Sequence, residues 1–417
     1  MRVPLFGKRL WLILGFLILI LINSCQVPTP TIEPFTSPDL PLDHNRIELT
    51  YPTPTHFASS PTPCQVSDNQ PTPVLEVPLI VFKQEGRNFY FDSVGGNDGN
   101  SGVDPQQPWQ SLKLLNSYNF EPGDTIHLKR GSTWNGTLFI WGSGQQDQPI
   151  IYTSYGEEGA APMFRNPENG NELTTAIRIT ADWVVVQQLQ IQDAKLAGVF
   201  IAVDADHNLI QGNEISAVGE GVAVHGQYSR IIGNYIHDLK MVHNTQGGDD
   251  DYGAIGVWLF NSDNEVAFNR LVRLKAASYD YGSDGGAIEF YKQVDRSLIH
   301  HNYVADSEGF LEIGGAKARD NRIYYNLIVN SGRVLGVHLG GKFGSAVRGL
   351  RIENNTVIDN QSKPEGASFQ FWWGDPEADT LNVQNNIFYL PNYQRLVSNG
   401  EIGFNHNLIY MPAGTDT

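Results

Sequence analysis

Cysteine is scarce in this sequence, with only 2 among 417 residues. So few cysteines cannot form a disulfide-stapled scaffold or a cysteine-based zinc fold. Positive charge is also scarce, because 28 Lys and Arg face 45 Asp and Glu, which gives a formal net charge of −17. Phosphate binding needs clustered Lys and Arg, so the composition argues against nucleic acid as a partner. An acidic polysaccharide would be repelled as well, unless a cation intervened.

The longest apolar run is Leu10 to Ile22, which follows a basic start and spans 13 residues. It is too short for a membrane span of about 20 residues and fits the apolar part of an export signal. The run leads into Ile22-Asn23-Ser24-Cys25, which resembles a bacterial lipobox. The resemblance implies that residues 1–24 are a signal peptide and that Cys25 is lipidated. The protein would then be exported and lipid-anchored to the cell membrane or outer membrane, facing away from the cytoplasm; an anchor helix or a plain cleavable signal is the alternative.

Proline is concentrated in the segment that follows this signal, since residues 26–80 hold 12 of the 23 prolines. Proline fixes φ and lacks a backbone donor, so neither a helix nor a sheet ladder is expected there. We predict an extended tether over residues 25–80, in the polyproline II conformation, that holds a domain clear of the membrane.

A repeat occupies the rest of the chain, residues 81–417. Ile or Val, two residues, Asn, one residue and an apolar residue recur, without helical periodicity. The Asn positions of this template are Asn213, Asn234, Asn269, Asn302, Asn326, Asn355 and Asn386. Short strands with an Asn at one corner indicate an all-β, right-handed parallel β-helix, whose coils lie about 4.8 Å apart. The asparagines are therefore interpreted as a hydrogen-bonded ladder and not as ligands.

The entry to this repeat resembles the opening of secreted right-handed parallel β-helix proteins grouped with polysaccharide lyases. The matching stretches are Phe89–Phe91, Gly96–Gly102, Pro108–Leu112, Pro122–Ile126 and Pro149–Tyr152. The resemblance implies a carbohydrate partner, but it is specific for the fold and not for the reaction, because this superfamily includes lyases, hydrolases, epimerases and non-catalytic surface proteins. Residues 111–117 are expected to form a short helix that caps the open end of the solenoid.

Two long insertions, residues 240–252 and 275–285, follow successive Asn strands and should lie side by side on the solenoid. Carboxylate oxygens are the ligands that Ca²⁺ prefers. The acidic residues of the insertions are therefore candidate calcium ligands, namely Asp249, Asp250, Asp251 and Asp284.

The strands that follow these insertions can be aligned on their leading glycines. Period-2 alternation then places Glu289 and Glu312 on one outward column, between Gly256 and Gly336. Two carboxylates about 5 Å apart must share a proton, raise a pKa or bind a cation. Nearby aromatic side chains offer faces on which sugar rings can stack, namely Trp258, Tyr291 and Trp372.

Three functions remain open on this evidence. The favoured one is a polysaccharide lyase, in which Ca²⁺ neutralises a uronate and Lys292, Lys317 or His338 abstracts the α-proton. The second is a glycoside hydrolase that uses the Glu289 and Glu312 pair as acid and as nucleophile or base. The third is a non-catalytic surface protein that binds glycans. A monomer is expected in each case.

Overall fold

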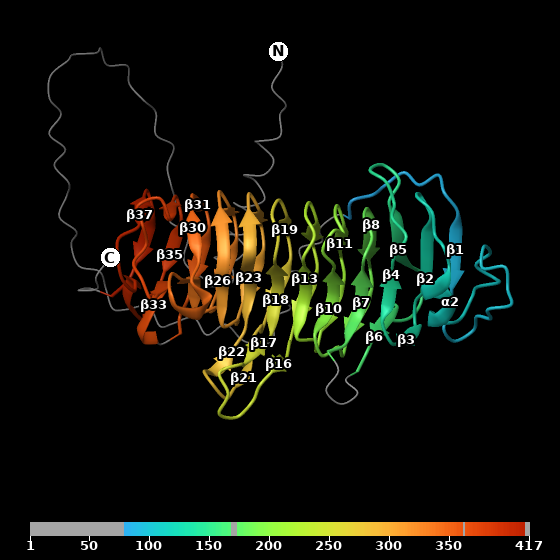
Figure 1. Ribbon diagram of the computed structural model, residues 1–417, viewed down its shortest axis with the longest axis horizontal. Helices are drawn as coiled ribbons and strands as arrows, with labels where there is room; N and C mark the ends of the chain where they lie inside the picture. Colours follow the sequence, from blue (N-terminus) through green and yellow to red (C-terminus); the bar gives the residue numbers. More distant parts are fainter. Residues whose placement is uncertain (1–78, 168–172, 362, 413–417) are drawn as a thin grey trace, which may run out of the picture. The chain divides into compact units, whose positions relative to one another are not determined.

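The computed structural model describes residues 79–167, 173–361 and 363–412 (Figure 1). The predicted signal peptide, Cys25 and nearly all of the predicted tether lie outside these ranges. Within them, no helix is long and apolar enough to cross a membrane.

Three long sheets, here called A, B and C, wind around one core, and every strand pair in them is parallel (Figure 1). Sheet A has 12 strands. They are β1 (Asn88–Phe91), β2 (Thr125–Lys129), β5 (Ile150–Tyr155), β8 (Val184–Gln187), β11 (Leu209–Gln211), β14 (Arg230–Ile232), β19 (Glu265–Ala267), β24 (Leu298–His300), β27 (Arg322–Tyr324), β31 (Leu350–Glu353), β34 (Leu381–Gln384) and β37 (Gly403–Asn405).

Sheet B has 11 strands and follows sheet A within most coils. They are β3 (Thr133–Asn135), β6 (Met163–Arg165), β9 (Gln190–Gln192), β12 (Glu214–Ser216), β15 (Tyr235–His237), β20 (Arg270–Val272), β25 (Tyr303–Ala305), β28 (Leu327–Val329), β32 (Thr356–Ile358), β35 (Ile387–Tyr389) and β38 (Leu408–Tyr410).

Sheet C completes the coils and carries the predicted carboxylate pair. Its strands are β4 (Leu138–Ile140), β7 (Thr175–Ile179), β10 (Ala197–Ile201), β13 (Glu220–Val224), β18 (Ile255–Leu259), β23 (Gly286–Asp295), β26 (Gly309–Arg319), β29 (Arg333–His338), β33 (Lys363–Trp372) and β36 (Tyr393–Val397), with β30 (Ala346–Arg348) pairing the end of β26. The predicted parallel β-helix is confirmed.

The core is a stack of aliphatic side chains that repeat from coil to coil. In sheet C, Val222, Val257, Ile288 and Leu311 are successive register partners and are all buried. Burying each such side chain contributes about 1.5–3 kcal/mol, so the same inward position is apolar in every coil. Because β-strand side chains alternate, the neighbouring position faces outward and is free to carry function.

The predicted Asn ladder is confirmed and is one coil longer than the repeat indicated. Asn302, for example, donates from its backbone N and its Nδ2 to Oδ1 of Asn326, both at 3.0 Å. Asn386 makes the same two bonds to Asn407, each 2.9 Å long. These bonds satisfy buried backbone groups at the corner, which would otherwise cost about 1–3 kcal/mol each.

A short helix covers the first coils, as predicted. It is α2 (Leu112–Ser117), and the Ser111 side chain caps it by accepting a hydrogen bond from the backbone N of Leu114 at 3.1 Å. Leu115 is the buried residue of this helix and belongs to the same core as the coils.

Two β-hairpins leave the solenoid at the same edge of sheet C (Figure 1). They are β16 (Met241–His243) with β17 (Tyr252–Gly253), and β21 (Ala276–Ser278) with β22 (Gly282–Asp284). The Asn244 side chain donates to the carbonyl of Ala277 at 2.9 Å, so the two insertions lie side by side as predicted. A 3-10 turn, η1 (Gly341–Phe343), follows β29.

Candidate functional site

The two glutamates are direct neighbours on the outer face of sheet C, because Glu289 of β23 and Glu312 of β26 are register partners. Gly336 of β29 is the next partner beyond Glu312, as predicted. On the other side, the partner of Glu289 is Trp258 and not Gly256. Trp258 therefore borders the carboxylate pair directly.

The predicted alignment of β18 was thus wrong by two residues, since Ile255 and not Gly253 pairs with Gly286. Each insertion is followed by Gly-Ala-Ile, which begins at Gly253 in one case and at Gly286 in the other. Aligning the two identical tripeptides hides a difference in how the chain re-enters the sheet. Gly256 faces the core, because an added Cβ would be 2.7 Å from Cδ1 of the core residue Leu274 and 2.5 Å from the carbonyl oxygen of Ala287.

The Glu312 carboxylate has two partners, the guanidinium of Arg333 and the imidazole of His338. Its Oε2 accepts a hydrogen bond from Arg333 Nη2, and its Oε1 lies 3.0 Å from His338 Nε2. Burial raises the pKa of this carboxyl, but the charge of Arg333 and the contact with His338 outweigh it and lower the pKa to about 2. Glu312 is therefore ionised over the whole ordinary pH range.

Glu289 is in the opposite situation, because no Lys, Arg or His side chain in the described ranges forms a hydrogen bond or ion pair with it. Burial and the nearby charges of Glu312 and Asp284 raise the pKa of Glu289 well above its ordinary value. The space beside it is kept open by glycine: a Cβ at Gly286 would lie 3.9 Å from Glu289 Oε1. The two environments thus favour the protonated form of Glu289 and the ionised form of Glu312, side by side.

Arg333 was not among the residues predicted from the sequence. It begins β29, and its side chain lies over Gly309, where an added Cβ would be 3.0 Å from Arg333 Cγ. Its guanidinium carbon is 5.2 Å from the ring centre of Trp372. The predicted register of β29 already placed Arg333 opposite Gly309, but register alone does not tell that its side chain reaches Glu312.

The aromatic candidates border the carboxylate pair on both sides. Trp258 and Tyr291 have ring centres 6.0 Å apart on the β18 side. Trp372 packs at 4.6 Å against His338 on the other side. Gly336 makes room for this indole, because an added Cβ would be 2.5 Å from Cη2 and 2.7 Å from Cζ3 of Trp372.

Lys292 is on the same strand as Glu289, β23, but its side chain lies over the ring of Phe260. Its Nζ lies 5.6 Å from the ring centre of Phe260, and the residue has φ of 63° just beyond Tyr291. Lys317 pairs in register with Gln293. Of the three predicted bases, all of which the structure describes, His338 is the one that contacts the glutamate pair.

The acidic residues of the hairpins form a separate group. Asp250, Asp251 and Asp280 each have an oxygen within 4.8 Å of the others, and Asp280 was not predicted. The carboxylate of Asp251 accepts hydrogen bonds from Thr245 N, Ser278 Oγ and Asp280 N at 2.8–3.0 Å. These donors lower the pKa of Asp251 despite burial.

Two of the predicted metal ligands lie outside this three-residue group. Asp249 accepts a hydrogen bond from the Tyr281 hydroxyl at 3.3 Å. Asp284 accepts one from the backbone N of Gly285 at 2.8 Å and lies near the glutamate pair. Burial, together with the charge of Glu312, raises the pKa of Asp284 to about 6.

Glu220, at the start of β13, is a further buried acid that the sequence analysis missed. It is 3% exposed, and burial raises its pKa from 4.5 to about 8. Glu220 pairs in register with Ile255, and Ile255 pairs with Gly286. Glu220 is therefore close enough to the site for its charge to act on Glu289.

Glu220→Gln should flatten the pH dependence of stability. Folded Glu220 keeps its proton up to about pH 8, whereas the unfolded chain loses it near pH 4.5. The folded state therefore loses stability between these values, by up to about 1.4 kcal/mol per pH unit, and the variant should not. Melting temperatures of both proteins from about pH 5 to about pH 8 would check this. Curves that run parallel to each other would contradict it, and Glu121→Gln, on an exposed carboxyl, is the control.

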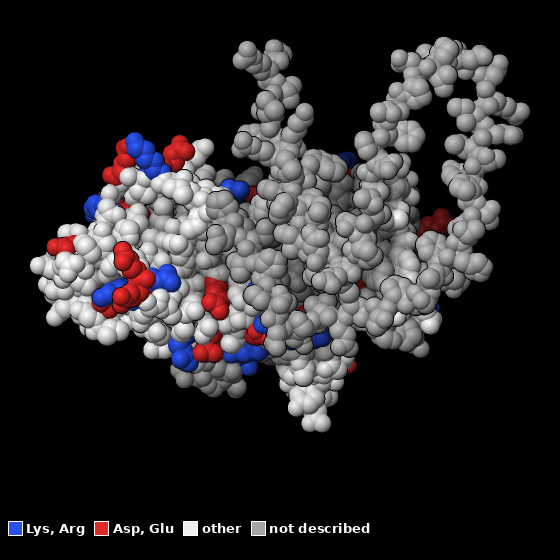
Figure 2. Space-filling view, turned by 180° about the vertical axis from the view of Figure 1, so that it is seen from behind, with Lys and Arg blue, Asp and Glu red and all other residues white. Residues whose placement is uncertain are grey.

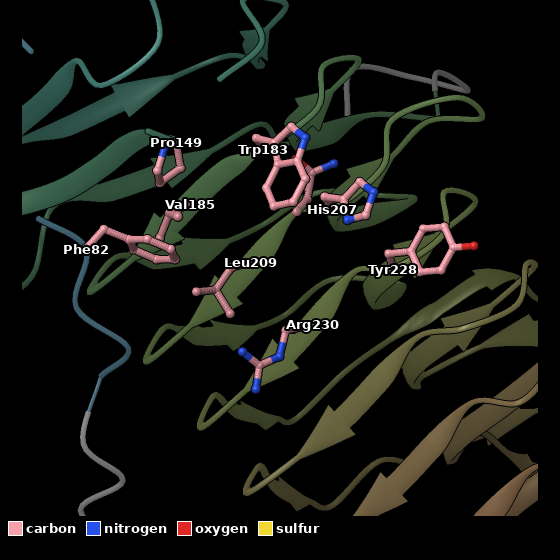
Figure 3. Close-up of a pocket in the computed structure, with 9 residues that line it drawn as sticks. Phe82, Pro149, Trp183, Val185, His207, Leu209, Tyr228 and Arg230 are labelled. Carbon is pink, nitrogen blue, oxygen red and sulfur yellow. The ribbon is translucent and has the colours of Figure 1, made fainter. Parts of the chain in front are cut away.

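One cavity of the described residues lies away from the glutamate pair. It has a volume of about 190 Å³ and is on the outer face of sheet A, between Phe82 and a stack of rings (Figure 3). Trp183 and His207 have ring centres 4.1 Å apart, and His207 and Tyr228 are 4.8 Å apart. The rings cover each other's faces, which is the geometry of a stabilising stack along the coils.

The far side of the protein carries charges of both signs. Figure 2 shows acidic and basic groups intermixed on that face, with no continuous basic patch among the described residues visible there.

Known proteins that are similar to this chain in sequence or in structure include two lacto-N-biosidases. A lacto-N-biosidase of Bifidobacterium longum is 33% identical over 93 residues, which is 21% of this chain and 6% of that protein. The chain therefore spans a small part of that relative's length. A GH136 lacto-N-biosidase from Eubacterium ramulus superposes with a TM-score of 0.50 at 16% identity, over 80% of this chain and 65% of that one.

An alginate lyase from a Paenibacillus species has a TM-score of 0.46 at 16% identity, over 73% of this chain and 95% of that one. Residues 175–409 match the family model described as the right-handed beta helix region. This match covers more than half of the chain, and the protein belongs to the right-handed β-helix family.

Proposed function

We propose that this protein is a carbohydrate-active enzyme and, more narrowly, a glycoside hydrolase whose catalytic residues are Glu289 and Glu312. One observation carries the proposal. Two carboxyls on adjacent strands have environments that move their pKa values apart, up for Glu289 and down to about 2 for Glu312. A protonated acid beside an ionised carboxylate is the pair that glycosidic bond cleavage requires.

In this mechanism Glu289 donates its proton to the leaving glycosidic oxygen while the bond from that oxygen to the anomeric carbon breaks. Adjacent parallel strands lie about 4.8 Å apart, close to the spacing of about 5–5.5 Å between the carboxyls of retaining enzymes. Glu312 therefore attacks the anomeric carbon as the nucleophile. Water, deprotonated by Glu289, then displaces Glu312 and completes hydrolysis with retention.

The arrangement of charge favours hydrolysis over the β-elimination that the sequence analysis preferred. A uronate bound at the pair would meet Asp284, Glu289 and Glu312, with Arg333 already engaged by Glu312. Lys292, a predicted base, lies over the Phe260 ring. We therefore propose a neutral sugar at the cleavage point, with Trp258, Tyr291 and Trp372 as stacking surfaces.

The names of similar proteins give further support. A lacto-N-biosidase is a relative in sequence over 93 residues, and another is similar in fold.

We also propose, from the sequence, that the protein is exported and anchored through a lipid on Cys25. Metabolic labelling with a radioactive fatty acid in a bacterial host, with Cys25→Ser as the control, would test the anchor.

Turnover on a panel of neutral and acidic polysaccharides tests the proposed reaction. We expect residues 79–417 to release reducing ends from a neutral polysaccharide, without the ultraviolet absorbance of an unsaturated uronate. Glu289→Gln and Glu312→Gln should release none. Unsaturated products would support a lyase instead, and no product from any polysaccharide would favour a protein that only binds glycans.

The calcium site remains a proposal that rests on the acidic residues of the two hairpins. Asp250, Asp251 and Asp280 are the residues that would hold the ion. Their oxygens are suitable in kind, but those of Asp251 already accept hydrogen bonds from the hairpins, and Ca²⁺ takes about 6–8 oxygen ligands. A bound ion there would supply charge that stabilises the hairpins.

Chelation should therefore leave turnover unchanged, because proton donation and nucleophilic attack come from the two glutamates. The measurement is the hydrolysis rate after dialysis against EDTA, compared with the rate in added Ca²⁺. A loss of activity that Ca²⁺ restores would contradict this expectation and favour the calcium-assisted lyase. Asp251→Asn, which keeps the size of the side chain, serves as the matched variant.

A further inference from the structure

The outer face of sheet C continues from the glutamate pair toward the N-terminal coils. Arg178 of β7, Phe200 of β10, Ala223 of β13 and Trp258 of β18 are successive register partners, and the partner of Trp258 is Glu289. These are four strand steps, so Arg178 lies about 19 Å from the pair along the solenoid. One surface therefore joins the proposed catalytic residues to this upstream region.

Aromatic rings cover that upstream region. His225 lies between two of them, with ring centres 4.7 Å from Phe200 and 3.9 Å from Phe260. Each of the three side chains is partly exposed. Phe260 in turn lies 4.7 Å from Trp258, which borders the glutamates. The rings thus form a platform that leads to the carboxylate pair.

Two cations lie at the ends of this platform. The guanidinium carbon of Arg178 is 4.5 Å from the Phe200 ring centre, and Lys292 Nζ is 5.6 Å from that of Phe260. Within the described parts of the chain, neither cation has a carboxylate within ion-pair distance. The only acid in β7, β10, β13 and β18 is Glu220, which is buried.

Unpaired cations are unexpected in a chain with a net charge of −17. The charges of both cations act on His225. Burial is the main cause that lowers the pKa of His225 to about 4, and the charges of Lys292 and Arg178 lower it further. The histidine is therefore neutral and adds no charge of its own at neutral pH. Exposed rings with two flanking cations form a surface suited to a sugar that carries negative charge.

We propose that Arg178, Phe200, His225, Phe260 and Lys292 form a subsite for an anionic sugar unit, bearing a carboxylate or a sulfate, of the polysaccharide. This inference rests on the proposed function for its link to cleavage. The preferred substrate would be a heteropolysaccharide, with a neutral sugar at the glutamate pair and an acidic sugar on the upstream coils. Arg178 and Lys292 select the charge, and the rings hold the sugar.

Binding by the Glu289→Gln variant tests the subsite, because it does not depend on catalysis. The probes are polygalacturonate for carboxylate, dextran sulfate for sulfate and unmodified dextran as the neutral polymer. We expect at least one anionic polymer to bind about tenfold or more tightly than dextran at low salt, and the preference to disappear near 0.5 M salt. Which anionic polymer binds distinguishes carboxylate from sulfate.

Adding Arg178→Gln and Lys292→Gln should abolish this preference and leave binding to dextran unchanged. Lys113→Gln with Arg351→Gln is the matched control, since it removes the same charge from exposed positions on α2 and β31. Equal binding of all three polymers, or a preference that survives Arg178→Gln/Lys292→Gln, would overturn the subsite. Catalytic loss in Glu289→Gln tests the proposed function separately.

Discussion

Glu312→Gln is expected to lower kcat/KM by about a thousandfold or more. The carboxylate is ionised because Arg333 and His338 contact it, and its pKa of about 2 leaves it ready to attack carbon at any ordinary pH. An amide of the same shape has no comparable nucleophilicity. Steady-state kinetics on the polysaccharide that the wild type hydrolyses would measure the loss.

Glu289→Gln should cause a similar loss, but one that depends on the leaving group. An activated aryl glycoside, whose phenolate leaves without a proton, should be cleaved by this variant much faster than the polysaccharide is. The folded state should not suffer, because the site already favours the neutral form of Glu289 and glutamine introduces no charge. Its melting temperature should stay level or rise above about pH 5.

Sheet A offers a matched control for these glutamates. Glu265 is also held by an arginine and a histidine, with Arg230 Nε at 2.5 Å and His300 Nε2 at 3.0 Å. Hydrogen bonding to His300, then to Arg230, outweighs burial and lowers its pKa to about 2. Glu265→Gln should keep wild-type turnover. Equal losses in all three variants would mean that general damage to the fold, and not chemistry, explains the effect.

Arg333→Met should reduce both stability and turnover. The Glu312 carboxylate would stay partly buried and lose its main cation. Breaking a fully buried pair costs about 3 kcal/mol or more, and we expect a smaller loss at neutral pH because these side chains are 25% and 15% exposed. The pKa of Glu312 would rise, so the low-pH limb of the rate profile should move upward from the very acidic range. Denaturant unfolding and the pH dependence of kcat/KM would measure the two effects.

Combining Arg333→Met with Glu312→Gln should restore most of the lost stability, because no unpaired charge is then buried. Turnover should stay absent in this double variant. A double variant as unstable as Arg333→Met alone would show that Arg333 acts by packing against Trp372, from which its guanidinium carbon lies 5.2 Å, and not through Glu312.

The sequence predicted the fold because the ladder asparagines recur in successive coils from Asn213 onward, together with the inward aliphatic residues. It also predicted that Glu289 and Glu312 are neighbours, since Gly309 to Ile313 repeats the alternation of Gly286 to Phe290 without a long insertion between them. The partner of Glu289 on β18 was missed because an insertion of different length precedes that strand.

Other parts of the site depend on distances that a repeat does not encode. Arg333 reaches Glu312 from the start of the following strand, across Gly309. Asp280 joins Asp250 and Asp251 because the two hairpins lie against each other. Side-chain direction decides such contacts, and Lys292 shows it clearly: its ammonium lies over Phe260, on the upstream surface.

The proposed acid and nucleophile pair is tested most directly by the mass of the product formed in water labelled with a heavy oxygen isotope. Hydrolysis adds the elements of water across the bond, so the released sugar should carry the heavy oxygen at its new reducing end. Elimination adds no water and leaves a double bond in one product. A labelled, saturated product that disappears in Glu312→Gln is the predicted result, and an unlabelled, unsaturated product would contradict the account.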